Sequence, residues 1–264
     1  MRTSLILLSL IYFCLPYSYA GQKYEIFKTK LNENLELLST YPKTIFDEEL
    51  ISFDPDSLSG VIAMEIISFL SSDDSTYFRQ EDFPLLENTT DSTNGTFFEV
   101  LIFGYHCGGT AGWIPKPITI KQTHGKTKIF NMIDTDCYFY DFYHLSEEKY
   151  LCIGSVPGWG SCRNEAIYVI DFKKDIPEFE PAFSNKAIFS ICNSSIEYEE
   201  INRIVTIEVE YLPSDNDCKS FFQDPDYSCF LIECNPDSDD NEDTVAILTT
   251  KYDGNKFIKP DYTD

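Results

Sequence analysis

The chain has 264 residues and a formal net charge of −24, from 44 acidic and 20 basic side chains. This charge repels nucleic-acid backbones and anionic membranes, so we expect neither as a partner. With 43% hydrophobic and 15% aromatic residues the chain can bury a sizeable core, which excludes a disordered protein. The acidity is typical of a soluble protein, and it also suits a protein that binds cations or basic surfaces.

Residues 1–20 have the physical character of a secretory signal peptide. Arg2 precedes an apolar run from Leu5 to Leu15, and Ser18-Tyr19-Ala20 provides small residues for a signal peptidase. A membrane span needs about 20 apolar residues, and this run is shorter. No later segment is long and apolar enough to cross a membrane. We therefore expect cleavage after Ala20, a secreted or periplasmic location and no membrane anchor.

Residues 21–96 are expected to form a helical segment followed by a loop. Apolar residues recur every three or four positions from 22 to 38, which predicts a helix that Tyr41-Pro42 ends. A second helix should begin near Asp56-Ser57 and end at residues 71–74. Its expected buried face consists of Leu58, Val61, Ile62, Ile66, Phe69 and Leu70. Residues 85–96 are rich in turn formers and are interpreted as a loop.

From Phe97 onward the apolar pattern has a period of two, so residues 97–264 are expected to form a disulfide-bonded antiparallel β domain. Strands are expected at 97–104, 118–122, 128–132, 149–154, 166–172, 205–211 and 245–250. His124-Gly125 and Asp253-Gly254 have the composition of hairpin turns. The expected fold is mainly β within the α+β class: an antiparallel meander of sandwich or barrel type with an N-terminal helical segment.

Eight cysteines follow residue 20, and an even number in an exported chain indicates disulfide bonds. They are Cys107, Cys137, Cys152, Cys162, Cys192, Cys218, Cys229 and Cys234. Cys229 lies in a strand expected at 227–233 and Cys234 follows it directly, and their odd spacing of five residues should point them to opposite faces. Spacing favours the pairs Cys218–Cys229, Cys152–Cys162, Cys107–Cys137 and Cys192–Cys234, with no free thiol, although other pairings stay open.

Aromatic residues are the candidate binding groups. Trp113 and Trp159 each have Gly and Pro neighbours, and an aromatic ring in such a loop can stack on a sugar or anchor a peptide. Residues 137–144 form the most aromatic stretch. On a strand, one face would carry Tyr138, Tyr140, Phe142 and His144. The structural alternatives are tryptophans that fold back over the core edge and an aromatic face that packs beneath a loop.

Residues 237–243 offer a candidate calcium site. Oxygen-bearing side chains alternate there at Asp237, Asp239, Asn241 and Asp243, which is the pattern that Ca²⁺-binding loops use. The segment lacks the central glycine and closing glutamate of an EF-hand, and an exposed acidic hairpin tip is the structural alternative. No other cofactor is indicated.

Two short motifs match parts of known nucleophile patterns. Gly160-Ser161-Cys162 matches part of the papain-like motif, but the last histidine, His144, lies upstream of it rather than far downstream. Ser146-Glu147-Glu148-Lys149 fits a serine-nucleophile pattern without its companion motifs, and it falls at an expected turn. We interpret both as structural.

Part of the chain resembles a segment of uncharacterised exported bacterial proteins. The similarity rests on Ser71-Ser72-Asp73-Asp74, on the strand expected at 97–104, and on Gly108-Gly109-Thr110 with the hairpin that follows. The resemblance implies export and β-structure, and it implies no activity.

The leading hypothesis is a secreted or periplasmic protein that binds an unknown protein or glycan ligand without catalysis. One alternative is a hydrolase of glycans or peptides, using carboxylates that the sequence does not single out. A second alternative is a calcium-stabilised adhesion-type module that depends on residues 237–243. A glycosidase would show two carboxyl groups about 5–10 Å apart in one cleft, whereas a binder would show an aromatic-lined surface without such a pair.

Overall fold

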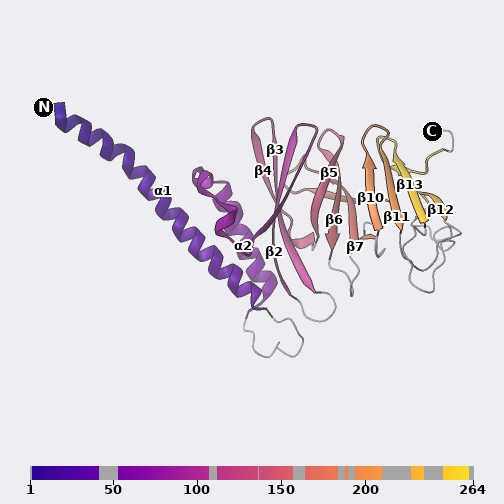
Figure 1. The fold of residues 1–264 in the computed structure, drawn as a ribbon, viewed down its shortest axis with the longest axis horizontal. Coiled ribbons are helices and arrows are strands. Elements are labelled where there is room, and N and C mark those ends of the chain that lie inside the picture. The colour runs from indigo at the N-terminus through magenta and orange to yellow at the C-terminus, as the bar shows by residue number, and fades with distance from the viewer. Residues whose placement is uncertain are drawn as a thin grey trace.

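The described residues form two long helices and three separate antiparallel sheets, which are stacked in chain order (Figure 1). The computed structural model describes residues 2–41, 53–106, 112–135, 137–156, 164–183, 188–189, 194–209, 227–234 and 246–261, with side chains from residue 21 onward except at 164, 188, 189 and 194. The mainly β fold of the α+β class is thereby confirmed. In the described part of the chain the sheets stack as separate layers, so the sandwich description applies rather than the barrel.

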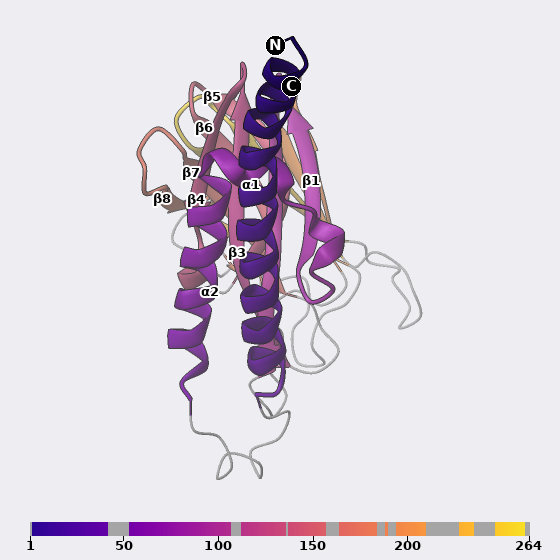
Figure 2. The ribbon, with the colours of Figure 1, turned by 90° about the vertical axis from the view of Figure 1, so that its left-hand side faces the viewer.

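Helix α1 (Arg2–Ser39) and helix α2 (Pro55–Leu70) lie together on one side of the sheets (Figure 2). The helix predicted at 22–38 is confirmed, and it continues toward the amino end without a break. The Asp54 carboxylate caps α2 by accepting hydrogen bonds from the amides of Asp56 and Ser57. Short 3-10 helices follow at Asp73–Tyr77, Gln80–Asp82 and Ile133–Thr135. No helix among the described residues has the length and apolar character that crossing a membrane requires.

The first sheet has the strand order β1-β2-β3-β4. Its strands are β1 (Glu87–Thr93), β2 (Thr96–His106), β3 (Trp113–Thr123) and β4 (Lys126–Asn131). The predicted loop at 85–96 is wrong over most of its length, because β1 pairs with β2 along all seven residues. Asn94 and Gly95, with φ of 46° and 72°, form the turn that permits this hairpin. The polar residues of β1 mark an edge strand rather than a loop.

The second sheet contains β5 (Tyr138–Ser146), β6 (Lys149–Val156), β7 (Asn164–Asp171) and β8 (Glu178–Pro181), in that order, with β9 (Ile188–Phe189) beside β7. The third sheet has the order β10-β11-β13-β12, with β14 beside β13. Its strands are β10 (Ser194–Glu199), β11 (Ile204–Val209), β12 (Leu231–Cys234), β13 (Ala246–Tyr252) and β14 (Phe257–Ile258).

Most predicted strands and both predicted hairpin turns are confirmed. At the second turn, Tyr252 pairs with Phe257 around Asp253-Gly254, and the Asp253 carboxylate accepts hydrogen bonds from the amides of Asn255 and Lys256. The strand expected at 227–233 is wrong in its first half, because residues 227–230 form a turn before β12 begins.

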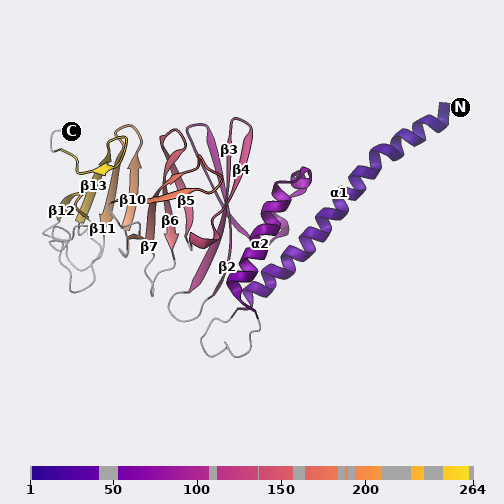
Figure 3. The same ribbon diagram turned by 180° about the vertical axis from the view of Figure 1, so that it is seen from behind.

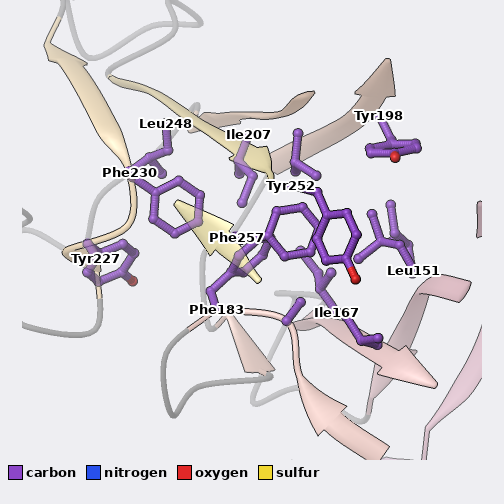
Figure 4. Packing of buried hydrophobic residues seen from close by; sticks show 14 of the residues in the cluster. Leu151, Ile167, Phe183, Tyr198, Ile207, Tyr227, Phe230, Leu248, Tyr252 and Phe257 are labelled. Atoms are coloured by element: carbon purple, nitrogen blue, oxygen red, sulfur yellow. The ribbon is translucent and has the colours of Figure 1, made fainter. Parts of the chain in front are cut away.

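Apolar side chains on both faces make the first and second sheets middle layers. On β2, Leu101 and Phe103 pack against the helices, whereas Phe98 and Val100 pack against the second sheet. The opposite face of the second sheet packs on the third sheet (Figure 4). This last interface includes Leu151, Ile167, Phe183, Tyr198, Ile207, Leu248, Tyr252 and Phe257.

The outer side of α2 is less covered than the sequence predicts. Ile62, Ile66 and Phe69 are buried as expected, but Val61 is 47% exposed and its neighbour Met64 is 70% exposed. Val61 lies next to the solvent side of the helix because the core-facing stripe of α2 follows Ile62, Ala63 and Ile66. Val61 therefore does not belong to the core face.

Hydrogen bonds that backbone amides donate to side-chain oxygens join the edges of the first and second sheets. Asp91 on β1 accepts one from the Phe142 amide on β5 at 2.7 Å, and Thr93 accepts a longer one from the His144 amide at 3.4 Å. The other Asp91 oxygen accepts a hydrogen bond from the Ser92 amide at 2.7 Å. Since β1 and β5 are both edge strands, these contacts close a corner between two sheets.

Candidate functional site at the loop end of the first two sheets

Two of the predicted aromatic residues, Trp113 and Tyr138, lie at one end of the stacked sheets. Trp113 begins β3 and Tyr138 begins β5, whereas the tight hairpin turns at 94–95, 124–125 and 147–148 belong to the other end (Figure 3). We call the end with Trp113 and Tyr138 the loop end. Trp159 belongs to the connection between β6 and β7, which lies outside the described residues.

Trp113 is half-buried and lies over Gly104 of the neighbouring strand β2. A Cβ atom on Gly104 would lie 2.2 Å from the Ile114 carbonyl oxygen and 2.8 Å from Cε2 of the Trp113 indole. Only glycine allows this close approach. The indole also packs against the core between the first and second sheets. The ring thus folds back over the core edge, as the structural alternative expects, and remains partly accessible.

Gly154 on β6 gives the second sheet a similar close contact. A Cβ atom there would lie 2.4 Å from the Tyr138 carbonyl oxygen, 2.9 Å from Cδ1 of Phe139 and 3.0 Å from Sγ of Cys137. In both sheets, therefore, a glycine on an inner strand lets the aromatic start of a neighbouring strand pack closely.

Tyr138 and Tyr140 form a half-buried aromatic pair beside a carboxylate. Their ring centroids are 6.3 Å apart, and the ring planes make an angle of 58°. The Tyr140 hydroxyl donates a hydrogen bond to Oε2 of Glu165, at the start of β7, over 2.5 Å. Burial, and then this hydrogen bond, raise the pKa of Tyr140 far above its usual value. The phenol therefore keeps its proton and holds the carboxylate at the loop end.

The predicted shared face of Tyr138, Tyr140, Phe142 and His144 is wrong. A register shift between Phe139 and Asp141 interrupts the alternation on β5. Phe142 consequently packs toward the first sheet, whereas Tyr140 packs against the core on the side of the third sheet. His144 lies near the end of the sheets that carries the hairpin turns. Its ring contacts Tyr150, and its Nδ1 is 3.3 Å from the side-chain nitrogen Nδ2 of Asn94. Tyr138 and Tyr140 keep a tilted ring contact, but Tyr138 packs against the core between the first two sheets and Tyr140 against the core between the second and third.

A carboxylate pair that the sequence did not single out lies at the corner between the first two sheets. Burial, and then the nearby charge of Asp91, raise the pKa of Asp141. Both Asp91 oxygens are engaged by backbone amides, from Phe142 and Ser92. We interpret the pair as part of the corner rather than as an acid and base for catalysis. No local sequence signal brings positions 91 and 141 together.

The expected disulfide bridges of Cys137, Cys152 and Cys229 are wrong in this structure. Cys137 and Cys152 are buried thiols in the core between the first and second sheets, and burial raises the pKa of each. Their side chains point into this interface rather than toward the connecting segments. Cys234 is disulfide-bonded, to a partner outside the described residues. Cys107, Cys162, Cys192 and Cys218 lie outside them as well.

The predicted calcium ligands Asp237, Asp239, Asn241 and Asp243 lie outside the described residues, so calcium binding stays a prediction. Within the part of the chain that the structure describes, no group of three or more His, Cys, Asp or Glu side chains is placed to hold a metal ion. The loop-end residues thus offer aromatic and carboxylate chemistry.

No family model, curated protein or solved structure matches the chain. The resemblance to exported bacterial proteins consequently stays a prediction, and the function must be argued from the residues themselves.

Proposed function

We propose that the chain is a secreted or periplasmic protein that binds a glycan or protein ligand without catalysis, through the loop end of the first two sheets. The observation that carries this proposal is the pair of half-buried tyrosines, Tyr138 and Tyr140, beside the carboxylate of Glu165. Trp113 adds a partly accessible indole at the same end of the molecule.

This chemistry suits a ligand with both an apolar face and hydrogen-bond donors. An aromatic ring stacks on the C–H face of a sugar or on an apolar side chain, and a fixed carboxylate accepts hydrogen bonds from hydroxyl or amine groups. The Tyr140 hydroxyl donates its hydrogen bond to Glu165, which holds this carboxylate beside the two rings. Gly104 beneath the Trp113 indole keeps that ring in place before binding, which reduces the entropy lost on association.

The hydrolase alternative would need a carboxylate pair in one cleft. The described carboxylate pair at the corner is Asp91 and Asp141, and both Asp91 oxygens already accept backbone hydrogen bonds. A binding site at the loop end therefore accounts better for the described residues.

Glycan and peptide arrays, followed by titration of the strongest ligand against the intrinsic tryptophan fluorescence, test the proposal. Tyr138→Ala and Glu165→Gln should each weaken binding about tenfold or more, the loss expected when a central aromatic or a buried hydrogen-bond partner is removed. Phe97→Ala, an exposed aromatic on β2, is the matched control and should bind normally. Binding that Phe97→Ala abolishes and Tyr138→Ala leaves intact would contradict the proposed site, and cleavage of the ligand would favour the hydrolase.

A further inference from the structure

Helices α1 and α2 pack on the first sheet with one side, and in the described part of the chain no layer covers their other side (Figure 2). Four large apolar side chains are exposed there: Ile26 and Leu37 on α1, and Val61 and Met64 on α2. We call the solvent-facing side of the two helices, along the seam where they meet, the outer helical face. Its apolar content points to an interface rather than to a surface that only contacts water.

Helix α2 carries almost no charge on this face. From position 57 to position 72 the only charged residue is Glu65, although 24% of the chain is charged. The exposed positions of α2 recur at spacings of four and three, which is the repeat by which one helix packs along another. They are Ser57, Val61, Met64, Ser68 and Ser71. A helix that faced only water would carry charged side chains at these positions.

A groove of about 550 Å³ lies between the two helices on the outer helical face. Phe27 and Phe69 stack in it, with ring centroids 4.1 Å apart, and Val61 and Met64 line its α2 side. Lys30 of α1 forms an ion pair with Glu65 of α2 there. The face thus combines an apolar groove with charges of both signs, as a helix-binding surface does.

The stripe of α1 beside the groove is complementary to its own reverse. It carries Ile26, Lys30, Glu33 and Leu37, again at spacings of four and three. If two copies of α1 run antiparallel and are centred between positions 31 and 32, Ile26 lies opposite Leu37 of the second copy. Lys30 then lies opposite Glu33 of the second copy, and each pair occurs twice, as two-fold symmetry requires. A parallel arrangement would instead place like charges against each other.

The same two-fold axis also suits α2. The stack of Phe27 on Phe69 fixes the level at which the two antiparallel helices face each other. Four to five residues further along α1, at positions 31 and 32, the facing level on α2 is therefore Met64 or its neighbour. Met64 then contacts Met64 of the second copy on the axis. The other members of the α2 stripe are serines and a valine, which let two helices approach closely.

The remaining charges of the helices are compatible with this arrangement. The other charged residues of α1 lie away from the groove or pair at the edge of the face: Lys23, Glu25, Lys28 and Glu36. Near the start of α2, Asp56 pairs with Lys116 of the first sheet. Residues 21–41 contain three acidic and three basic side chains, so a second copy meets no net repulsion from this part of an otherwise acidic chain.

The size of the outer helical face indicates a reversible interface. Helix α2 has 16 residues and is thus about 24 Å long, and two helices side by side are about 20 Å wide. Two copies would therefore bury roughly 1,000 Å² in total, which is near the lower limit for a specific interface. Such a contact is formed and lost as the protein concentration changes.

We propose that the chain forms a two-fold symmetric dimer through the outer helical face, with α1 antiparallel on α1 and α2 antiparallel on α2. Ile26, Leu37 and Met64 supply the apolar contact, and the Lys30–Glu33 pairs between copies fix the register. The interface shares no residue with the aromatic site at the loop end, so either proposal can fail without the other. The dimer would carry that site twice, once on each copy.

Sedimentation equilibrium of the full protein tests the proposal, and the mass should rise from monomer to dimer with concentration. Glu33→Lys and Lys30→Glu should each weaken association about tenfold, because two attractive pairs become repulsive. A 1:1 mixture of these two variants should associate about as tightly as the parent protein, because each lysine again faces a glutamate. Glu208→Lys makes the same charge change at an exposed position of the third sheet and should stay within about twofold of the parent.

A symmetric cross-link tests the position of the axis. Met64→Cys should form a disulfide between two copies in oxidised glutathione, whereas Ile201→Cys, at a position that is 90% exposed on the third sheet, should not. Circular dichroism reports that each variant is folded.

A mass that stays at the monomer up to about 1 mM protein would overturn the proposal. A mixture that associates no better than its two components, or an equal loss of association in Glu208→Lys, would overturn it too. Cross-linking through position 201 as fast as through position 64 would place the contact elsewhere on the molecule.

Discussion

Replacing Gly154 by alanine should destabilise the protein, because Gly154 packs against the backbone carbonyl of Tyr138 on the neighbouring strand. The added Cβ would lie 2.4 Å from the Tyr138 carbonyl oxygen, a distance that atoms do not adopt, so β5 or β6 must move. Overpacking in a core typically costs about 1–3 kcal/mol. Since rotation of a side chain cannot relieve a clash with a backbone carbonyl, we expect the upper end of that range.

Part of this cost is offset because alanine restricts the unfolded chain more than glycine does, by about 0.5–1 kcal/mol. The net loss in the free energy of unfolding is then about 2 kcal/mol, which lowers Tm by roughly 4–8 °C for a chain of this size. Urea unfolding followed by tryptophan fluorescence measures the first quantity, and calorimetry measures the second.

Gly60→Ala provides the matched control, because Gly60 lies within α2 and its added Cβ would meet nothing within 4 Å. This variant should be about 1 kcal/mol more stable than the parent, as expected for alanine in a helix interior. If Gly154→Ala proved as stable as the parent, the close packing of β5 over Gly154 would be refuted, together with the argument that this glycine positions Tyr138.

Three further outcomes follow from the structure. Asp91→Ala should lower the free energy of unfolding by about 1–3 kcal/mol in urea titrations, because it leaves a backbone amide without its acceptor, whereas Glu87→Ala on the same strand should have little effect. Burial, and then the carboxylates nearby, raise the pKa of Tyr143 from 10.0 to about 12, so folding favours the neutral phenol. The free energy of unfolding, measured against pH, should therefore fall between pH 10 and 12 and should not fall on this account below pH 10. Cys137 and Cys152 should resist a maleimide reagent in the native protein and react once it is unfolded, and modification of either native thiol would contradict their burial.

The strands could be predicted where buried and exposed side chains alternate regularly along the sequence. β11 and β13 expose one face and bury the other, so their period of two is clear in the sequence. β1 could not be found in this way, because almost all its residues are polar and its pairing depends on β2. The Asn94-Gly95 pair was the available signal for the hairpin.

For the candidate site, the sequence could predict some of the residues but not their arrangement in space. The sequence identified Trp113, Tyr138 and Tyr140, but a bulge on β5 cannot be seen in a pattern that is aromatic on both faces. Glu165 is one of 44 acidic residues, and only the fold brings it to Tyr140. The two thiols in the core escaped prediction because counting cysteines says nothing of where each sulfur points.

The stacking of layers in chain order has a consequence for the way the protein is made. A chain synthesised from its amino end can close the first sheet on the helices when residue 131 is available, and the Asp91 corner can form once β5 follows. Each layer then offers its free apolar face as the template for the next. The third sheet is completed last, and it covers Leu151 and Ile167 of the second sheet. A chain that was truncated after β8 would therefore expose this apolar face of the second sheet to solvent.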